Sequence, residues 1–135
     1  EVFLVDKLGF SWDEVHEIAE ELEHIKSEQL INKLDAFLGF PVADPHGDPI
    51  PDAKGEMKMY QKTSLLEIPV GSICQLVAVK DNSAMFLQYV SELGIGLKTK
   101  IKVISIMDFD GSLRIEVNRK QHNVSQKFAE NLLVK

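Results

Sequence analysis

Four side chains that can bind a metal ion recur at helical spacing near the start of the chain: His16, Glu20, Glu23 and His24. An α-helix turns by about 100° per residue, so all four lie within an arc of about 100°. The apolar residues of the same segment occupy the opposite side. Imidazoles and carboxylates one turn apart are the ligands with which helical bundles bind divalent cations. The sequence therefore predicts a cation site on one face of a helix.

The same residues have a simpler interpretation, a solvated acidic face with oppositely charged pairs four residues apart, and composition alone favours it. Basic partners are nearly absent, however, because Lys26 is the only basic residue between Lys7 and Lys33. A face of like charges repels itself unless a cation binds it or a partner covers it. The cation site is therefore the more specific of the two hypotheses.

The overall charge limits the partners of the chain. Its 135 residues are 44% hydrophobic and carry a net charge of -6, and the length fits one domain or two small ones. Residues 1–60 contain 14 acidic and 5 basic side chains, whereas residues 61–135 contain 7 acidic and 10 basic ones. Neither part has the dense basic surface that nucleic-acid binding needs, so we do not expect this chain to bind DNA or RNA by itself.

Cysteine usage and hydropathy indicate a compartment. The one cysteine, Cys74, cannot form an internal disulfide, which suits a reducing environment. No apolar run reaches the roughly 20 residues of a membrane span, and no signal peptide begins the chain. We therefore expect a cytoplasmic protein with no membrane partner. Because the first residue is Glu1 and not Met, we also expect the chain to be a piece of a longer protein.

Three helices are expected to position the ligand-type residues. The first ends before Gly9, a helix stop signal. The segment that begins with Ser11 has the capping-box pattern, which predicts Ser11 as the N-cap of a helix over residues 12–25. Ser27 is predicted to cap a third helix that extends to about residue 38. Residues 41–62 contain four of the five prolines and are expected to form a linker.

The rest of the chain predicts a small β-structure. Alternating and β-branched segments predict strands over residues 72–80, 99–107, 113–117, 121–124 and 132–135. A short helix is expected over residues 84–93 and a helical turn over residues 125–130. Several short strands within about 70 residues favour a barrel of the SH3-like type. The expected fold class is therefore α+β.

Taken together, Val15-His16, Glu20, Glu23-His24 and the later run Asp44-Pro-His-Gly-Asp-Pro-Ile-Pro51 resemble one known family. They are similar to the metal-dependent repressors of the diphtheria toxin repressor and manganese transport regulator type. The resemblance covers nearly the whole chain. It implies a helical dimerisation and metal-binding domain over residues 1–40, the proline-rich linker over residues 41–62, and an SH3-like domain similar to the ferrous-transport module over residues 63–135.

The resemblance also implies a function. Members of the family bind operator DNA through an amino-terminal winged helix, which this chain lacks. The chain would then be the metal-sensing and dimerisation part of a transcriptional repressor that controls metal homeostasis genes. Metal would fix the DNA-binding segment relative to a homodimer, since a ligand switches a protein through its differential affinity for two arrangements.

By resemblance, Glu20, Glu23 and His24 match the regulatory metal site of the family. Glu20 stands where iron-type members have cysteine and manganese-type members have glutamate. Replacing a soft thiolate by a carboxylate favours harder ions such as Mn²⁺. The implied ion is therefore Mn²⁺ or Fe²⁺, with Zn²⁺ as a substitute.

A second site of the family matches His16 and Glu1. Asp44 stands where streptococcal-type members have a cysteine just before Pro-His-Gly, and it offers an oxygen ligand. Asp81, after the first long strand, is the nearest match to a ligand that the SH3-like domain lends. His46 belongs to the same motif, but a loop histidine is more often a turn or surface residue than a ligand.

Two other functions compete with the repressor. A metal hydrolase would need an open coordination site beside a general base or nucleophile, and the sequence offers no nucleophile constellation. An adaptor would bind peptide through the SH3-like domain, while the helices serve only to dimerise. We therefore expect no enzymatic activity and keep the adaptor as the alternative.

Overall fold

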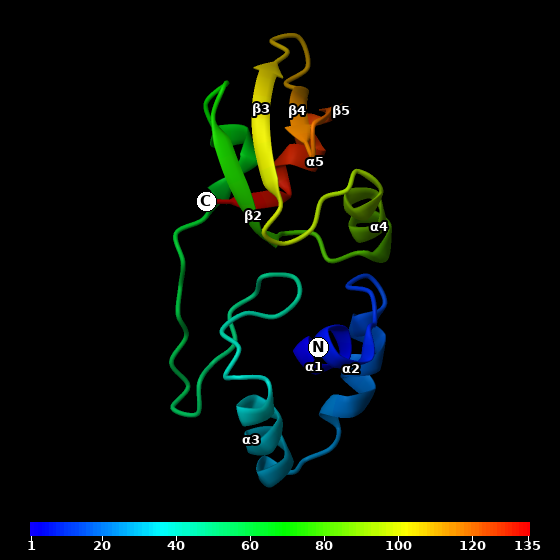
Figure 1. Cartoon of the computed structure of the whole chain (residues 1–135), viewed down its shortest axis with the longest axis vertical. Coiled ribbons are helices and arrows are strands. Elements are labelled where there is room, and N and C mark those ends of the chain that lie inside the picture. Colours follow the sequence, from blue (N-terminus) through cyan, green and yellow to red (C-terminus); the bar gives the residue numbers. More distant parts are fainter. The chain divides into compact units, whose positions relative to one another are not determined.

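The computed structural model describes all residues 1–135 and divides into two compact units, Glu1–Met59 and Tyr60–Lys135 (Figure 1). The first unit contains three short helices, and the second contains a six-stranded antiparallel sheet with two further α-helices. The fold is therefore α+β, as the sequence predicts. None of the helices is both long enough and apolar enough to cross a membrane.

Helix α1 spans Val2–Leu8 and ends as predicted at Gly9. Gly9 has φ 76°, a left-handed conformation that glycine adopts without steric cost. The amides of Gly9 and Phe10 donate to the carbonyls of Val5 and Leu4. These bonds satisfy the last turn of the helix and reverse the chain toward the next one.

Helix α2 spans Val15–Glu23, so the predicted helix over residues 12–25 is too long at both ends. The prediction that Ser11 is its N-cap is wrong. The Ser11 hydroxyl donates to the Glu14 carboxylate at 2.6 Å, and the Ser11 carbonyl accepts from the amides of Glu14 and Val15. Because the hydroxyl is engaged with the Glu14 side chain, residues 12–14 form a turn and the helix begins only at Val15.

Helix α3 spans Glu28–Phe37, and the prediction of Ser27 as its N-cap is confirmed. The Ser27 hydroxyl accepts a hydrogen bond from the Leu30 amide at 3.2 Å, which satisfies one of the free amides of the first turn. The chain leaves the helix through Gly39, whose φ is 75°, and residues 41–56 continue as a series of turns.

The interior of the first unit is small. Its fully buried side chains are Leu4, Val15 and His46. Phe3 and Phe37 make an edge-to-face contact, with ring centroids 6.4 Å apart. Large apolar side chains of this unit remain exposed: Leu8, Leu22, Ile25, Leu30, Ile31, Phe37, Phe40, Val42, Met57 and Met59. This unit therefore exposes more apolar side chains than it buries, a pattern that marks interaction surfaces.

The second unit is built on one sheet with the strand order β1-β6-β2-β3-β4-β5. Its strands are β1 Thr63–Ser64, β2 Ile73–Val79, β3 Lys100–Ile106, β4 Leu113–Val117, β5 Lys120–Val124 and β6 Leu132–Val134. Its helices are the 3-10 helix η1 Leu65–Glu67, α4 Ala84–Glu92 and α5 Gln126–Glu130. Strands β2 to β6 and both α-helices lie where the sequence predicts them, whereas β1 and η1 were not predicted.

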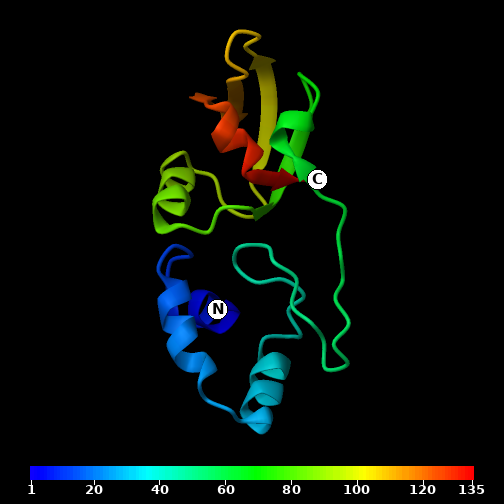
Figure 2. The same ribbon diagram turned by 180° about the vertical axis from the view of Figure 1, so that it is seen from behind.

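Local caps and a continuous core hold the second unit together. The hydroxyls of Ser83 and Ser125 accept hydrogen bonds from the amides of Phe86 and Phe128, which starts α4 and α5. Helix α5 packs against η1 and β6 (Figure 2). Its Phe128 is buried, and the ring contacts the rings of Phe86 and Tyr89 on α4. Since alternate residues of β2, β3 and β4 are also buried, the sheet has one apolar face, as in small barrels.

Candidate metal centre

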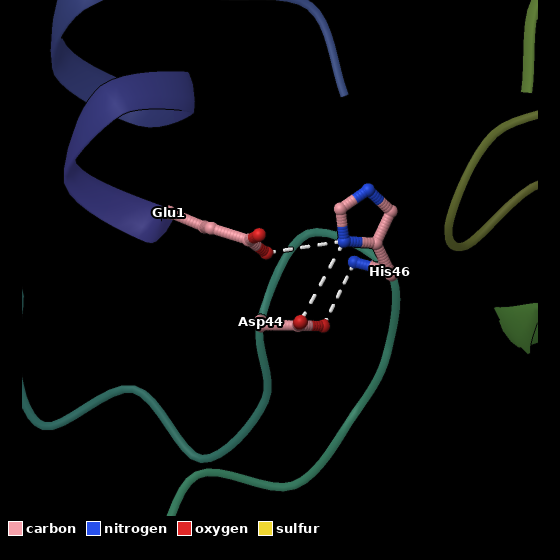
Figure 3. A group of neighbouring side chains, drawn as sticks. All are labelled: Glu1, Asp44 and His46. Carbon is pink, nitrogen blue, oxygen red and sulfur yellow. Dashed lines mark hydrogen bonds and ion pairs between the residues drawn. The ribbon is translucent and has the colours of Figure 1, made fainter. Parts of the chain in front are cut away.

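Three donor side chains from two distant segments meet in the first unit. Glu1 precedes α1, and Asp44 and His46 lie in the turn that follows α3 (Figure 3). One donor atom from each of the three lies within 4.8 Å of the others. The His46 Nδ1 atom is 3.1 Å from Glu1 Oε2 and 3.6 Å from Asp44 Oδ2. Two carboxylates therefore face the same ring nitrogen.

A tight turn positions Asp44 and His46. Asp44 Oδ1 accepts hydrogen bonds from the backbone amides of His46 and Asp48, both at 2.8 Å. The Gly47 amide donates to the Asp44 carbonyl, and Gly47 has φ 88°. One oxygen of the Asp44 carboxylate thus shapes the turn, and the other oxygen faces the His46 ring.

His46 is the one polar side chain among the buried residues, with 2% of its surface exposed. Its Nε2 atom lies 2.7 Å from the carbonyl oxygen of Trp12, and the Trp12 ring stacks on the imidazole at a centroid distance of 6.3 Å. A carbonyl oxygen only accepts, so Nε2 must carry a proton. In the neutral ring, Nδ1 therefore has a free lone pair that points at Glu1 and Asp44.

The electrostatics of the group follow from these contacts. The hydrogen bond with the Asp44 carboxylate, opposed by burial, raises the pKa of His46 to about 9. Burial alone would raise the pKa of the Asp44 carboxyl, but the hydrogen bonds from His46 and Asp48 outweigh it and hold that pKa below its usual value. In the absence of a metal ion, a proton on His46 Nδ1 supplies the positive charge between the two carboxylates.

His16 and Glu20 on α2 extend this group. Glu1 Oε1 lies 3.0 Å from His16 Nδ1, so a single carboxylate contacts the imidazoles of both His16 and His46. His16 Nε2 is 3.6 Å from Glu20 Oε1, the contact that helical spacing predicts. An open pocket of about 360 Å³ lies over these residues. Its lining residues are Glu1, Val2, His16, Ala19, Glu20, Glu23, Asp44 and Ile50.

Two of the predicted site residues, His24 and Asp81, are not among the residues that line this pocket. His24 is the C-cap of α2, where the helix ends, and its side chain is exposed and does not line the pocket. Asp81 belongs to the second unit, between β2 and α4. Its Oδ1 accepts a hydrogen bond from the Ser83 amide at 2.8 Å, so this oxygen shapes the turn before α4.

His46 is the site residue that the sequence predictions undervalued. A turn or surface role was favoured; His46 does lie in a turn, but its burial shows that the surface alternative is wrong. A second turn, over residues 52–56, has the same hydrogen bonds as the turn over residues 44–48. Asp52 Oδ1 accepts from the amides of Lys54 and Glu56, and Lys54 at the position of His46 is exposed. Since the turn forms without a histidine, His46 is not needed to make it.

The donor set suits a divalent cation. Imidazole and carboxylate together bind Mn²⁺, Fe²⁺ or Zn²⁺, and the Nε2–H bond to a backbone carbonyl is the outer contact typical of metal-binding histidines. No thiol takes part, because Cys74 is buried in β2 of the second unit. Residues Glu1, Asp44 and His46 therefore fit a metal ion chemically and geometrically.

Comparison with known proteins agrees with this chemistry. Residues 1–52 match the family model of the iron dependent repressor, metal binding and dimerisation domain, and residues 63–135 match the FeoA domain. The iron-dependent repressor IdeR of Mycobacterium tuberculosis is 43% identical over 51 residues, which are 38% of this chain and 22% of that protein.

Solved structures extend the likeness to the whole chain. A manganese-dependent transcriptional repressor is 35% identical with a TM-score of 0.93, over 100% of this chain and 73% of that chain. Another, in complex with manganese, is 34% identical with a TM-score of 0.87, over 98% of this chain and 63% of that chain. ScaR with bound Zn²⁺ is 33% identical with a TM-score of 0.83, over 100% of this chain and 67% of that chain. The chain thus spans about a fifth of the curated relative and about two thirds of these solved chains.

Proposed function

Because the chain belongs to the family of metal-dependent transcriptional repressors in which a metal binding and dimerisation domain is followed by a FeoA domain, we propose that it is the metal-sensing and dimerisation part of such a repressor. The observation that carries the proposal is the group of Glu1, Asp44 and His46, with His46 Nδ1 directed at two carboxylates. The ion is Mn²⁺ or Fe²⁺, with Zn²⁺ as a substitute, because the ligands are oxygen and imidazole nitrogen.

Glu1, Asp44 and His46 would hold one ion. His16, Glu20 and Glu23 on α2 would contribute to a second, together with His24 at the C-cap of that helix. Bound there, an ion would supply the positive charge that the four pocket carboxylates lack. Glu1 would connect the two places, since its two oxygens already face His46 and His16.

The proposed partners are a second copy of the chain and operator DNA. The exposed apolar side chains of the first unit support a homodimer, because a twofold partner would cover them. DNA would bind through an amino-terminal winged helix, and the cytoplasm is the proposed location. Glu1 before α1, Asp44 in the turn after α3 and Trp12 in the turn before α2 all contact His46, so an ion there would fix three segments relative to one another.

The test is operator binding by the full-length protein, titrated with Mn²⁺, Fe²⁺ and Zn²⁺. We expect DNA affinity to rise with at least one ion, and to lose that response in His46→Gln and in the double variant Glu20→Ala with Glu23→Ala. Lys54→Gln, at the matching position of the second turn, should respond as the natural protein does. DNA binding that is indifferent to all three ions would refute the repressor and favour a dimeric adaptor.

A further inference from the structure

The backbone hydrogen bonds of the turn over residues 44–48 do not determine whether the histidine side chain is buried or exposed. The turn over residues 52–56 has the same four bonds: two amides donate to the first aspartate, its own amide donates to the carbonyl four residues on, and the glycine amide donates to its carbonyl. In that second turn the side chain of Lys54 is exposed to solvent. The backbone therefore permits an exposed side chain at this position, and contacts of the imidazole itself must hold His46 inward.

Glu1 makes one such contact, at His46 Nδ1, and Trp12 makes two others. The carbonyl oxygen of Trp12 accepts the Nε2 proton of His46 at 2.7 Å, and its ring lies nearly parallel to the imidazole, at an angle of 9°. The carbonyl fixes which nitrogen carries the proton, and the stacked ring fixes the plane of the imidazole. Trp12 lies in the turn immediately before α2, 34 residues from His46 in the sequence.

We infer that Trp12 is a positioning residue for metal binding, which makes Nδ1 of His46, and not Nε2, the atom that meets a divalent cation between Glu1 and Asp44. The inference rests on the proposed function, because it assumes that a cation binds there. It adds a connection between two parts of the first unit. The imidazole that binds the ion through Nδ1 also holds the turn before α2 through Nε2. An ion at Nδ1 therefore affects the position of the helix that carries His16 and Glu20.

Nitrogen-15 NMR of the histidine rings tests the inference, with Zn²⁺ as a diamagnetic probe at pH 7.5. We expect Zn²⁺ to shift His46 Nδ1 to a metal-bound value while Nε2 keeps its proton. Trp12→Phe keeps the stack and should preserve both signals. Trp12→Ala keeps the backbone carbonyl but removes the ring, so it should weaken Zn²⁺ binding by roughly two- to tenfold, the range that a stacked aromatic pair contributes.

A fluorescence measurement complements the NMR, since Trp12 is the only tryptophan of the chain. Zn²⁺ should change its emission in the natural sequence, and should leave it unchanged in His46→Gln. Zinc bound through Nε2, or equal Zn²⁺ affinity in Trp12→Ala and the natural protein, would overturn the inference. Rescue by Trp12→Phe excludes general unfolding of the Ala variant as the cause.

Different experimental results would contradict this inference and the proposed function. If Zn²⁺ leaves the His46 ring signals unchanged but still promotes operator binding, the repressor function holds and the role of Trp12 is wrong. If Zn²⁺ binds Nδ1 but operator binding does not respond to any ion, the positioning role holds and the repressor function is wrong.

Discussion

Protons and metal ions should compete for His46, and the structure sets the size of that competition. Nδ1 is the atom that faces Glu1 and Asp44, and in the ion-free protein it carries a proton because the pKa of His46 is raised to about 9. An ion must displace this proton in order to bind. At pH 7 the apparent affinity is then lower than the intrinsic one by about two powers of ten, since the pH lies about two units below the pKa.

The expected result is a steady rise of the apparent Mn²⁺ affinity with pH. Between pH 6 and pH 8 the apparent Mn²⁺ affinity should rise about tenfold per pH unit, because one proton leaves His46 for each ion bound. The Asp44 carboxyl, whose pKa is lowered, is already ionised in this range and adds no proton. Titration calorimetry at pH 7 in two buffers of different ionisation enthalpy counts the protons released, and we expect about one from His46.

Two variants sharpen the assay. His46→Gln should weaken Mn²⁺ binding and reduce proton release by about one per ion. Lys54→Gln changes the same position of the matching turn, and it should leave both quantities unaltered. An affinity that stays constant from pH 6 to pH 8, with no proton transferred to the buffer, would show that His46 is not a ligand.

Further measurements test the remaining parts of the structure. Asp44→Asn keeps an oxygen that accepts the turn amides but loses the charge, so Mn²⁺ affinity should fall at least about tenfold, whereas Asp52→Asn in the second turn should leave it unchanged. Because the pKa of His46 is higher in the fold than its usual 6.5, the protonated ring stabilises the ion-free protein below that pH, and this stabilisation is lost as the pH rises through about 9. Urea unfolding should show a loss of up to about 3 kcal/mol over that range, and no such loss in His46→Gln. Leu76→Ala removes a fully buried side chain of β2 and should cost about 2–5 kcal/mol of unfolding free energy, which thermal unfolding would detect. Phe109 is wholly exposed in the β3–β4 turn, so Phe109→Ser should change that free energy by less than about 0.5 kcal/mol, and a larger loss would contradict the exposed position.

The elements that the sequence predicted well are those that local contacts determine. Ser27 starts α3 through its own hydroxyl, and Gly9 ends α1 through its own backbone conformation. The start of α2 was mispredicted because the Ser11 hydroxyl can bond either to the backbone amide of Glu14 or to the Glu14 carboxylate, and it bonds to the carboxylate. Strand β1 escaped prediction for a different reason. It has only two residues, and they pair with β6, which lies about 70 residues later in the sequence. No local sequence pattern therefore predicts it.

The contacts of the candidate site also differ in whether local sequence predicts them. Periodicity placed His16 and Glu20 on one helix face, and the two side chains are neighbours in the structure. The contact between Glu1 and His46 joins residues 45 positions apart, and only the fold brings them together. The spacing of Asp44 and His46, two residues apart before a glycine, was the one local signal available. It could not reveal that Trp12 would cover the imidazole.

The two matching turns also bear on how such a site can originate and change. Their backbone is determined by an aspartate at the first position and a glycine at the fourth, and the third position contributes to the turn only its backbone amide, which donates to the aspartate. One accommodates an imidazole there and the other an ammonium group, on the same main-chain path. A mutation at the third position can therefore add, remove or exchange a ligand in one step without remodelling the loop. In this region of the protein the main-chain hydrogen bonds of the turn do not depend on the metal ligand, so a ligand can change while the turn itself is kept.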